Sequence, residues 1–297
     1  MTITRGVDNS TEKEHFALTV LGVRGSVPVH GPRFDTFGGA TTCFFIEAGD
    51  QAVFVDAGTG IIEAQPSMYE ERQVSVLITH PHLDHMAGLP FFKPLTEADR
   101  RIDIFAVMRD GQNTGEILSA LFRRPYWPLM IEEYPADIRY HTLPYHALLN
   151  MRDLSLPVER PMLRLGECAV DGFEVCHPGG CTAYRLHYRG KTIVVATDTE
   201  VAACGPEEEE QLTAFLEGTD LLMADCQYTE EEYGRKEGYG HSTISQWLKI
   251  KDWCGVGDLV AVHHDPMHDD DFLTAMERET GRPDVHIARV GDRYGLI

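Results

Sequence analysis

The stretch Thr79-His80-Pro81-His82-Leu83-Asp84-His85 decides which fold and which chemistry we expect of this chain. It places four side chains that can bind a metal within six residues, directly after the apolar run 74–78, where a strand would open into a loop. Imidazole and carboxylate groups are common ligands of divalent metal ions. A polar turn whose histidines merely cap a following helix would explain this density poorly. The stretch therefore indicates a metal-dependent enzyme.

Other apolar runs with strand character also end at residues that can bind or support a metal. Asp56 ends the run 51–56, His177 follows the run 169–176, and Asp198 follows the run 192–197. The doublet His263-His264 follows the run 259–262 and leaves open which imidazole would face a metal. Each of these predicted strands thus delivers a candidate site residue at its end.

The pattern H-x-H-x-D-H after a strand resembles the defining motif of the metallo-β-lactamase superfamily, and the segments 54–60, 175–180 and 194–200 resemble its first, third and fourth motifs. The resemblance implies an α/β fold, a four-layer αβ/βα sandwich. It also implies a two-metal site in which one carboxylate bridges the metals. The implied ligands are His80, His82 and His177 at one metal, Asp84, His85 and His263 at the other, and Asp198 between them.

The resemblance also implies a cofactor and a supporting residue. Imidazole-rich, carboxylate-bridged ligation without thiolate suits two divalent ions of zinc, and also of manganese or iron, so ligand type alone does not choose the metal. The family resemblance favours Zn²⁺. Asp56 is expected to support the metal ligands rather than bind a metal. We prefer His263 over His264 as the ligand, and His264 stays open as the alternative.

The segments 22–28, 37–43, 85–92 and 228–243 are similar to the phosphodiesterase branch of the superfamily, which includes tRNA 3′-processing endonucleases and small cyclic phosphodiesterases. There, two cations share a hydroxide that attacks the phosphorus. The resemblance makes Asp84 the residue that orients or deprotonates the nucleophile. It makes His241 the general acid for the departing oxygen. The alternative for His241 is a position near the start of the helix predicted over 242–254.

The charge balance bears on the substrate. There are 26 basic and 47 acidic residues, and the resulting net charge of −21 repels extended nucleic acid. We therefore predict a small or cyclic phosphodiester, such as a cyclic nucleotide, as substrate. A tRNA 3′-processing endoribonuclease stays open, although it would need a flexible basic, glycine-rich arm that is not evident in 109–165. A lactone, thioester or β-lactam hydrolase and a catalytically silent ligand-binding module are further alternatives.

We expect a polar N-terminal leader at 1–15 and a single domain at 16–297 with a helical and irregular insert at about 109–165. Seven cysteines without a C-x-x-C pair indicate reduced thiols and a cytoplasmic protein. The chain contains no apolar span of ~20 residues, so neither a signal peptide nor a membrane span is predicted. Relatives that bind small phosphodiesters are commonly dimers, and the resemblance thus allows a homodimer.

Overall fold

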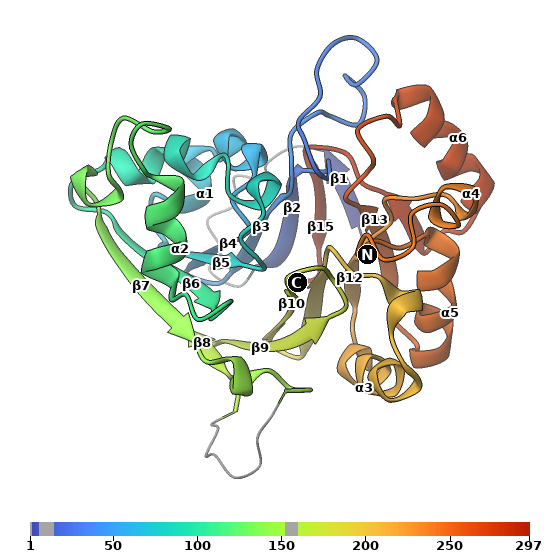
Figure 1. Cartoon of the computed structure of the whole chain (residues 1–297). Coiled ribbons are helices and arrows are strands. Elements are labelled where there is room, and N and C mark those ends of the chain that lie inside the picture. The colour runs from blue at the N-terminus through green and yellow to red at the C-terminus, as the bar shows by residue number, and fades with distance from the viewer. Residues whose placement is uncertain (1, 6–14, 152–159) are drawn as a thin grey trace.

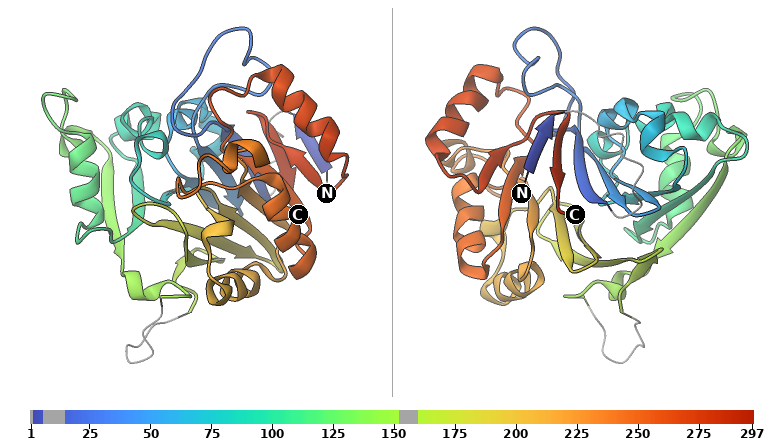
Figure 2. Two further views of the ribbon diagram at one scale, coloured as in Figure 1. Left: turned by 45° about the vertical axis from the view of Figure 1, so that its right-hand side comes forward. Right: turned by 180° about the vertical axis from the view of Figure 1, so that it is seen from behind.

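Two β-sheets pack face to face, and helices cover their outer faces (Figure 1). The structure is a computed structural model that describes residues 2–5, 15–151 and 160–297. The two packed sheets with helices on their outer faces confirm the predicted αβ/βα sandwich. A view turned by 45° and a view from behind show the same layers, with α1 and α2 outside one sheet and α3, α5 and α6 outside the other (Figure 2).

Within the described residues, the first sheet has eight strands, and β4 to β7 run parallel to one another. In their order across the sheet, the strands are β1 (Thr2–Arg5), β15 (Asp292–Gly295), β2 (Phe16–Gly22), β3 (Cys43–Ala48), β4 (Gln51–Val55), β5 (Gln73–Ile78), β6 (Arg101–Val107) and β7 (Asp137–Leu143).

The second sheet has seven strands in the described part of the chain, and β11 to β14 are parallel. Across the sheet they are β14 (Val285–Ile287), β13 (Asp258–Val262), β12 (Leu221–Asp225), β11 (Lys191–Ala196), β10 (Cys181–Tyr188), β9 (Cys168–Val175) and β8 (Leu163–Leu165). The helices that cover the two sheets are α1 (Pro66–Tyr69), α2 (Thr114–Leu121), α3 (Pro206–Leu216), α4 (Glu230–Tyr233), α5 (Ile244–Cys254) and α6 (Asp270–Thr280).

The core is layered because successive side chains of a strand point to opposite faces of the sheet. In β4, Val53 and Val55 belong to the apolar cluster between the sheets, whereas Ala52 and Phe54 belong to the cluster under α1 and α2. A third cluster lies between the second sheet and α3, α5 and α6, and includes the fully buried Trp247. Strands that are apolar on both faces are typical of parallel sheets covered on both sides. No described helix has the length and apolarity needed to cross a membrane.

Two segments differ from the sequence prediction. The segment 109–165, predicted to be a helical and irregular insert, contains α2 and also supplies β7, which pairs with β6 at the edge of the first sheet. The prediction missed β7 because this strand is half exposed and polar and lacks an apolar run. Residues 2–5 of the expected leader pair with β15. Residues 6–14 and 152–159 of these predictions lie outside the described residues.

Candidate metal centre

The first group of side chains that could hold a metal ion consists of three imidazoles. His80 follows β5, His82 precedes a short 3₁₀ turn at Leu83–His85, and His177 follows β9. Their ligand nitrogens lie within 4.8 Å of one another, with His82 Nδ1 3.2 Å from His177 Nε2. His80 and His177 each direct Nε2 to within 3.8 Å of Asp198 Oδ1. Because His82 is exposed while His80 is buried, the group opens to solvent on one side.

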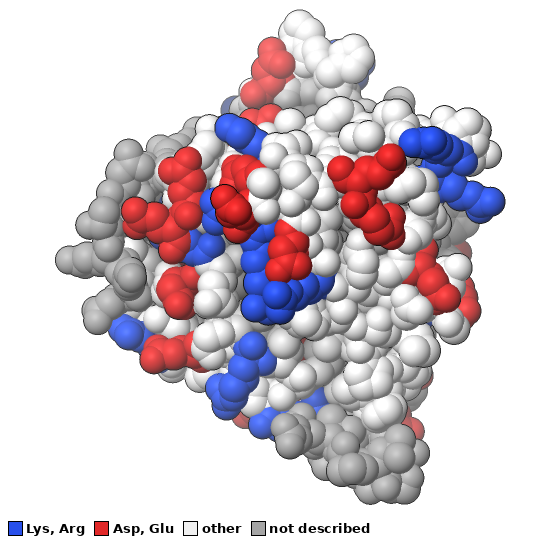
Figure 3. Space-filling model, turned by 90° about the vertical axis from the view of Figure 1, so that its left-hand side faces the viewer, with Lys and Arg blue, Asp and Glu red and all other residues white. Residues whose placement is uncertain are grey.

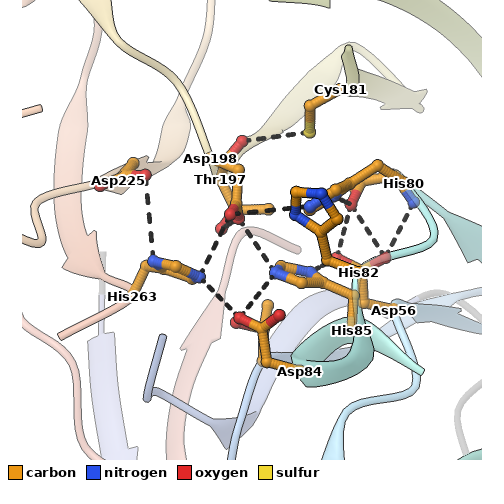
Figure 4. A network of polar contacts seen from close by, with 12 residues as sticks. Asp56, His80, His82, Asp84, His85, Cys181, Thr197, Asp198, Asp225 and His263 are labelled. Atoms are coloured by element: carbon orange, nitrogen blue, oxygen red, sulfur yellow. Dashed lines mark hydrogen bonds and ion pairs between the residues drawn. The ribbon is translucent and has the colours of Figure 1, made fainter. Parts of the chain in front are cut away.

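A second group joins the first through Asp198 (Figure 4). Asp198 Oδ2 lies 3.1 Å from His85 Nε2, and its Oδ1 lies 3.3 Å from His263 Nε2. Asp84 Oδ2 faces the same two nitrogens, at 3.3 Å from His85 and 3.2 Å from His263. The structure therefore brings together all seven side chains that the motifs nominate as ligands, with Asp198 in the bridging position.

Parallel strands deliver these side chains to one edge of the fold. Asp56 and His263 are the first residues after β4 and β13, and Asp198 is the second residue after β11. Their φ angles are 62°, 61° and 52°, respectively. Left-handed backbone is uncommon for residues other than glycine and costs of order 1–3 kcal/mol for each residue. Three such residues at the same edge indicate that the fold maintains local strain in order to place these side chains.

Asp56 contacts one of the candidate ligands from the side away from the centre. Its carboxylate accepts hydrogen bonds from the Thr79 backbone N–H (2.8 Å) and the Thr79 hydroxyl (2.9 Å). It also lies 2.7 Å from His85 Nδ1, which leaves Nε2 of that ring for the centre. Asp56 belongs to none of the metal-binding groups found among the described residues.

Comparable contacts orient two further rings. His263 Nδ1 lies 2.9 Å from Gln227 Oε1, and His177 Nδ1 lies 3.0 Å from the Gly240 carbonyl oxygen. In both rings the Nδ1 contact fixes the orientation in which Nε2 faces the cluster. The Ser26 backbone N–H donates a hydrogen bond to Asp84 Oδ2 at 2.7 Å.

His264 points away from the centre. Its Nε2 lies 3.1 Å from the Ala288 carbonyl oxygen, and its ring meets Phe37 edge-on. Burial, with a contribution from Arg24, lowers the pKa of His264 to about 3, so the ring is neutral at pH 7. Of the two histidines after β13, the structure thus brings His263 to the cluster and assigns His264 to the packing behind it.

His241 lies beside the centre and is paired with a carboxylate that the motifs did not nominate. Its Nδ1 is 2.7 Å from Oδ2 of Asp225, and its ring stacks on that of His263 at 4.9 Å between centroids. The N-cap of α5 is Thr243, so His241 does not cap that helix. Asp225 is the last residue of β12 and is fully buried. Its position at a strand end, like that of Asp198, is a signal that could have identified it.

The electrostatics of the centre suit cations. Burial lowers the pKa of His80 and of His177, so these rings are neutral ligands at pH 7. Burial also acts to lower the pKa of His263, but Asp198 and Asp84 outweigh it and raise this pKa to about 9. His80 Nε2 is buried and has no hydrogen-bond partner in the described part of the chain. The neutral rings of His80 and His177, the buried carboxylates and the unpaired nitrogen fit divalent metal ions, and a cation held between the carboxylates would replace the proton that they favour on His263.

Comparisons with known proteins give a family match, a similar sequence and solved structures of the same fold. Residues 51–264 match the family model described as beta-lactamase superfamily domain. Ribonuclease Z of Bradyrhizobium sp. (strain ORS 278) is 25% identical over 94% of this chain and 99% of its own length. Two crystal structures share the fold: the metallo-beta-lactamase fold protein YhfI from Bacillus subtilis (TM-score 0.65, 19% identity, 95% of this chain and 99% of that chain) and the short form of human tRNase Z (0.64, 15%, 95% and 99%).

Proposed function

Because the chain belongs to the beta-lactamase superfamily, we propose that it is a metal-dependent phosphodiesterase that cleaves RNA, with the 3′ end of precursor tRNA as its substrate. The observation that carries the proposal is the assembled centre. Asp198 belongs to the second ligand group and lies 3.8 Å from two imidazoles of the first. His241 lies beside them, in a further group with Asp198, Asp225 and His263, and is held by Asp225. Such a constellation suits hydrolysis of a bond whose leaving oxygen needs a proton.

The residues of the centre have different roles in this reaction. The two ligand groups would hold a pair of Zn²⁺ ions, which, when bound, lower the pKa of water and neutralise charge on the phosphate. Asp84 lies between His85 and His263 and orients the attacking water. His241, held at Nδ1 by Asp225, directs Nε2 toward the substrate and donates the proton to the leaving oxygen.

Similarity over the whole length supports RNA as the substrate. The Bradyrhizobium relative named ribonuclease Z aligns with 94% of this chain and 99% of its own length. A second relative of that name, from Ignicoccus hospitalis, is 27% identical over 66% of this chain and 71% of its own length. Shared fold alone would not choose a substrate, because the same centre can serve different reactions. Because both relatives are named ribonuclease Z, we prefer RNA as the substrate over the small phosphodiester that the charge balance favours.

A small or cyclic phosphodiester is the second candidate, because the surface is poorly suited to a long anion. The segment 109–165 has two glycines, Gly111 and Gly115, and no glycine-rich basic stretch. The side on which α2 and β7 lie shows acidic and basic groups next to one another (Figure 3). Many of these basic groups pair with carboxylates, as Arg101 does with Asp103 and Arg139 with Asp137. Paired arginines attract phosphates less than free ones do.

A substrate panel tests the proposal. Protein reconstituted with Zn²⁺ is incubated with precursor tRNA carrying a 3′ trailer, cyclic mononucleotides, cyclic dinucleotides, bis(p-nitrophenyl) phosphate, a lactone and a thioester. We expect release of the trailer and hydrolysis of the aryl phosphodiester, with both activities lost in Asp84→Ala. Turnover of cyclic nucleotides without trailer release would establish the second candidate. Turnover of acyl compounds alone would overturn both.

A further inference from the structure

Glu200 is a buried carboxylate beside the centre that belongs to neither ligand group. Only 3% of its surface is exposed, and donors from one stretch of chain occupy both of its oxygens. Oε1 accepts hydrogen bonds from the Gly238 N–H (2.7 Å) and the Tyr233 hydroxyl (2.9 Å), and Oε2 accepts one from the Gly240 N–H (2.8 Å). One side chain thus fixes the loop 238–240 at two successive points.

That loop in turn orients two imidazoles of the centre. The Gly240 carbonyl oxygen lies 3.0 Å from His177 Nδ1 and thereby directs Nε2 of that ring into the cluster. The next residue along the chain is His241. Gly240 has φ +91°, and a Cβ atom there would lie 2.2 Å from His177 Nδ1, so both the conformation and the close approach require glycine.

The backbone of Glu200 reaches the other side of the same imidazole. Its N–H donates a hydrogen bond at 2.8 Å to the carbonyl of Cys176, the residue before His177. His177 is therefore held through its chain neighbour by the Glu200 backbone and through its Nδ1 by the loop that the Glu200 carboxylate fixes. A charged acceptor of two backbone N–H groups forms stronger bonds than a neutral acceptor would.

We infer that Glu200 is a positioning residue that holds the loop 238–240 so that His177 faces the metal site and His241 faces the leaving oxygen. The inference rests on the proposed phosphodiesterase function and adds a residue to it. It predicts two separable defects when the carboxylate is changed. One is weaker metal binding at the group of three histidines, and the other is poorer protonation of the leaving group.

Glu200→Gln tests both defects, because the amide keeps the size of the side chain but turns an N–H₂ group toward one of the two backbone donors. We expect bound zinc to fall from about two equivalents toward one after dialysis. We expect kcat to fall about 10–100-fold for an RNA substrate, whose leaving oxygen needs a proton, with KM little changed. Bis(p-nitrophenyl) phosphate, whose leaving group is stable without a proton, should be affected less.

The matched control is Glu116→Gln, because Glu116 also accepts a backbone N–H, that of Asn113 at 2.8 Å, but does so at the start of α2. Its metal content and rates should equal those of the wild type. Glu200→Asp keeps the charge and should recover part of the loss. Equal losses on both substrates with full zinc content, no loss at all, or unfolding of both Glu200 variants would overturn the inference. A wild type inactive on every phosphodiester would instead refute the proposed function, and the zinc measurement would still test Glu200.

Discussion

The imidazole of His241 and the carboxylate of Asp225 form a buried pair, with Nδ1 of the ring 2.7 Å from Oδ2 of the acid. The contact fixes the ring's orientation and leaves Nε2 as the atom that can exchange a proton with a substrate. Asp225 lies at the end of β12, between the strands that deliver Asp198 and His263. The general-acid candidate is thus attached to the same sheet edge as the ligands.

Asp225→Asn should therefore slow the reaction without emptying the centre. The amide no longer holds Nδ1–H as a charged acceptor does, and we expect kcat on RNA to fall about 10–100-fold while KM changes little. The control is Asp258→Asn, because Asp258 pairs with His286 at 3.0 Å but lies at the opposite end of the neighbouring strand β13. Equal loss of activity in the two variants would contradict the role given to Asp225.

The two histidines after β13 make a matched pair for metal analysis. His263→Gln should lower bound zinc from about two equivalents to about one, because its Nε2 faces both Asp84 and Asp198. His264→Gln should retain the zinc and lower the free energy of unfolding by about 1–3 kcal/mol, because the contact with the Ala288 carbonyl is disturbed. Elemental analysis and urea denaturation measure the two effects. Zinc loss in the His264 variant alone would reverse the assignment.

Most of the fold follows from local sequence. The apolar runs 51–56, 169–176, 192–197 and 259–262 agree with β4, β9, β11 and β13 to within one residue at each end, since burial on both faces leaves a continuous apolar signal. The strand β7 was not predicted because its partly exposed, polar residues form no continuous apolar run. The candidate ligands could be named because each stands in a motif at a strand end.

The supports of the centre were harder to predict because they depend on contacts between distant segments. His82 and His177 are 95 residues apart in the chain, and the motifs brought them together only through family resemblance. Asp225 and Glu200 stand in no motif that assigned them a role, and their partners lie 16 and 40 residues further on. Spacing alone does not reveal which carboxylate meets which loop, because tertiary packing decides it.

The cysteines give a test of burial that needs no substrate. All seven are free thiols, and Cys176, Cys204 and Cys254 are partly exposed. Burial raises the pKa of Cys168 to about 12, so this thiol stays protonated, and unreactive, at pH 8. The Cys204 thiol, 3.2 Å from Cys176 Sγ, lowers the pKa of Cys176, so we expect an aromatic disulfide reagent at pH 8 to label Cys176 first and the four buried thiols only after denaturation. Labelling of Cys168 in the native protein at the rate of a free thiol would contradict its placement.

The substitution Asp56→Asn tests whether Asp56 stabilises the folded protein itself or acts only through metal binding. Its carboxylate is fully buried and accepts two hydrogen bonds from Thr79 besides the contact with His85. Asp56→Asn turns an N–H₂ group toward one of these donors, and a buried polar group that loses its partner is costly. In urea with a chelator, so that metal does not contribute, we expect the free energy of unfolding to fall by about 3–5 kcal/mol.

Asp103→Asn is the comparison for Asp56→Asn. Asp103 also pairs with a histidine, at 2.6 Å from His141 Nε2, but the two side chains of this pair are partly exposed. Loss of the contact between Asp103 and His141 should lower the free energy of unfolding by no more than about 1 kcal/mol, since solvent screens exposed pairs. If the Asp56 variant were no less stable than the Asp103 variant without metal yet failed to bind zinc, Asp56 would act on the metal ligands alone. A large loss of stability without metal instead means that the support is part of the folded core, which prepares His85 before any metal binds.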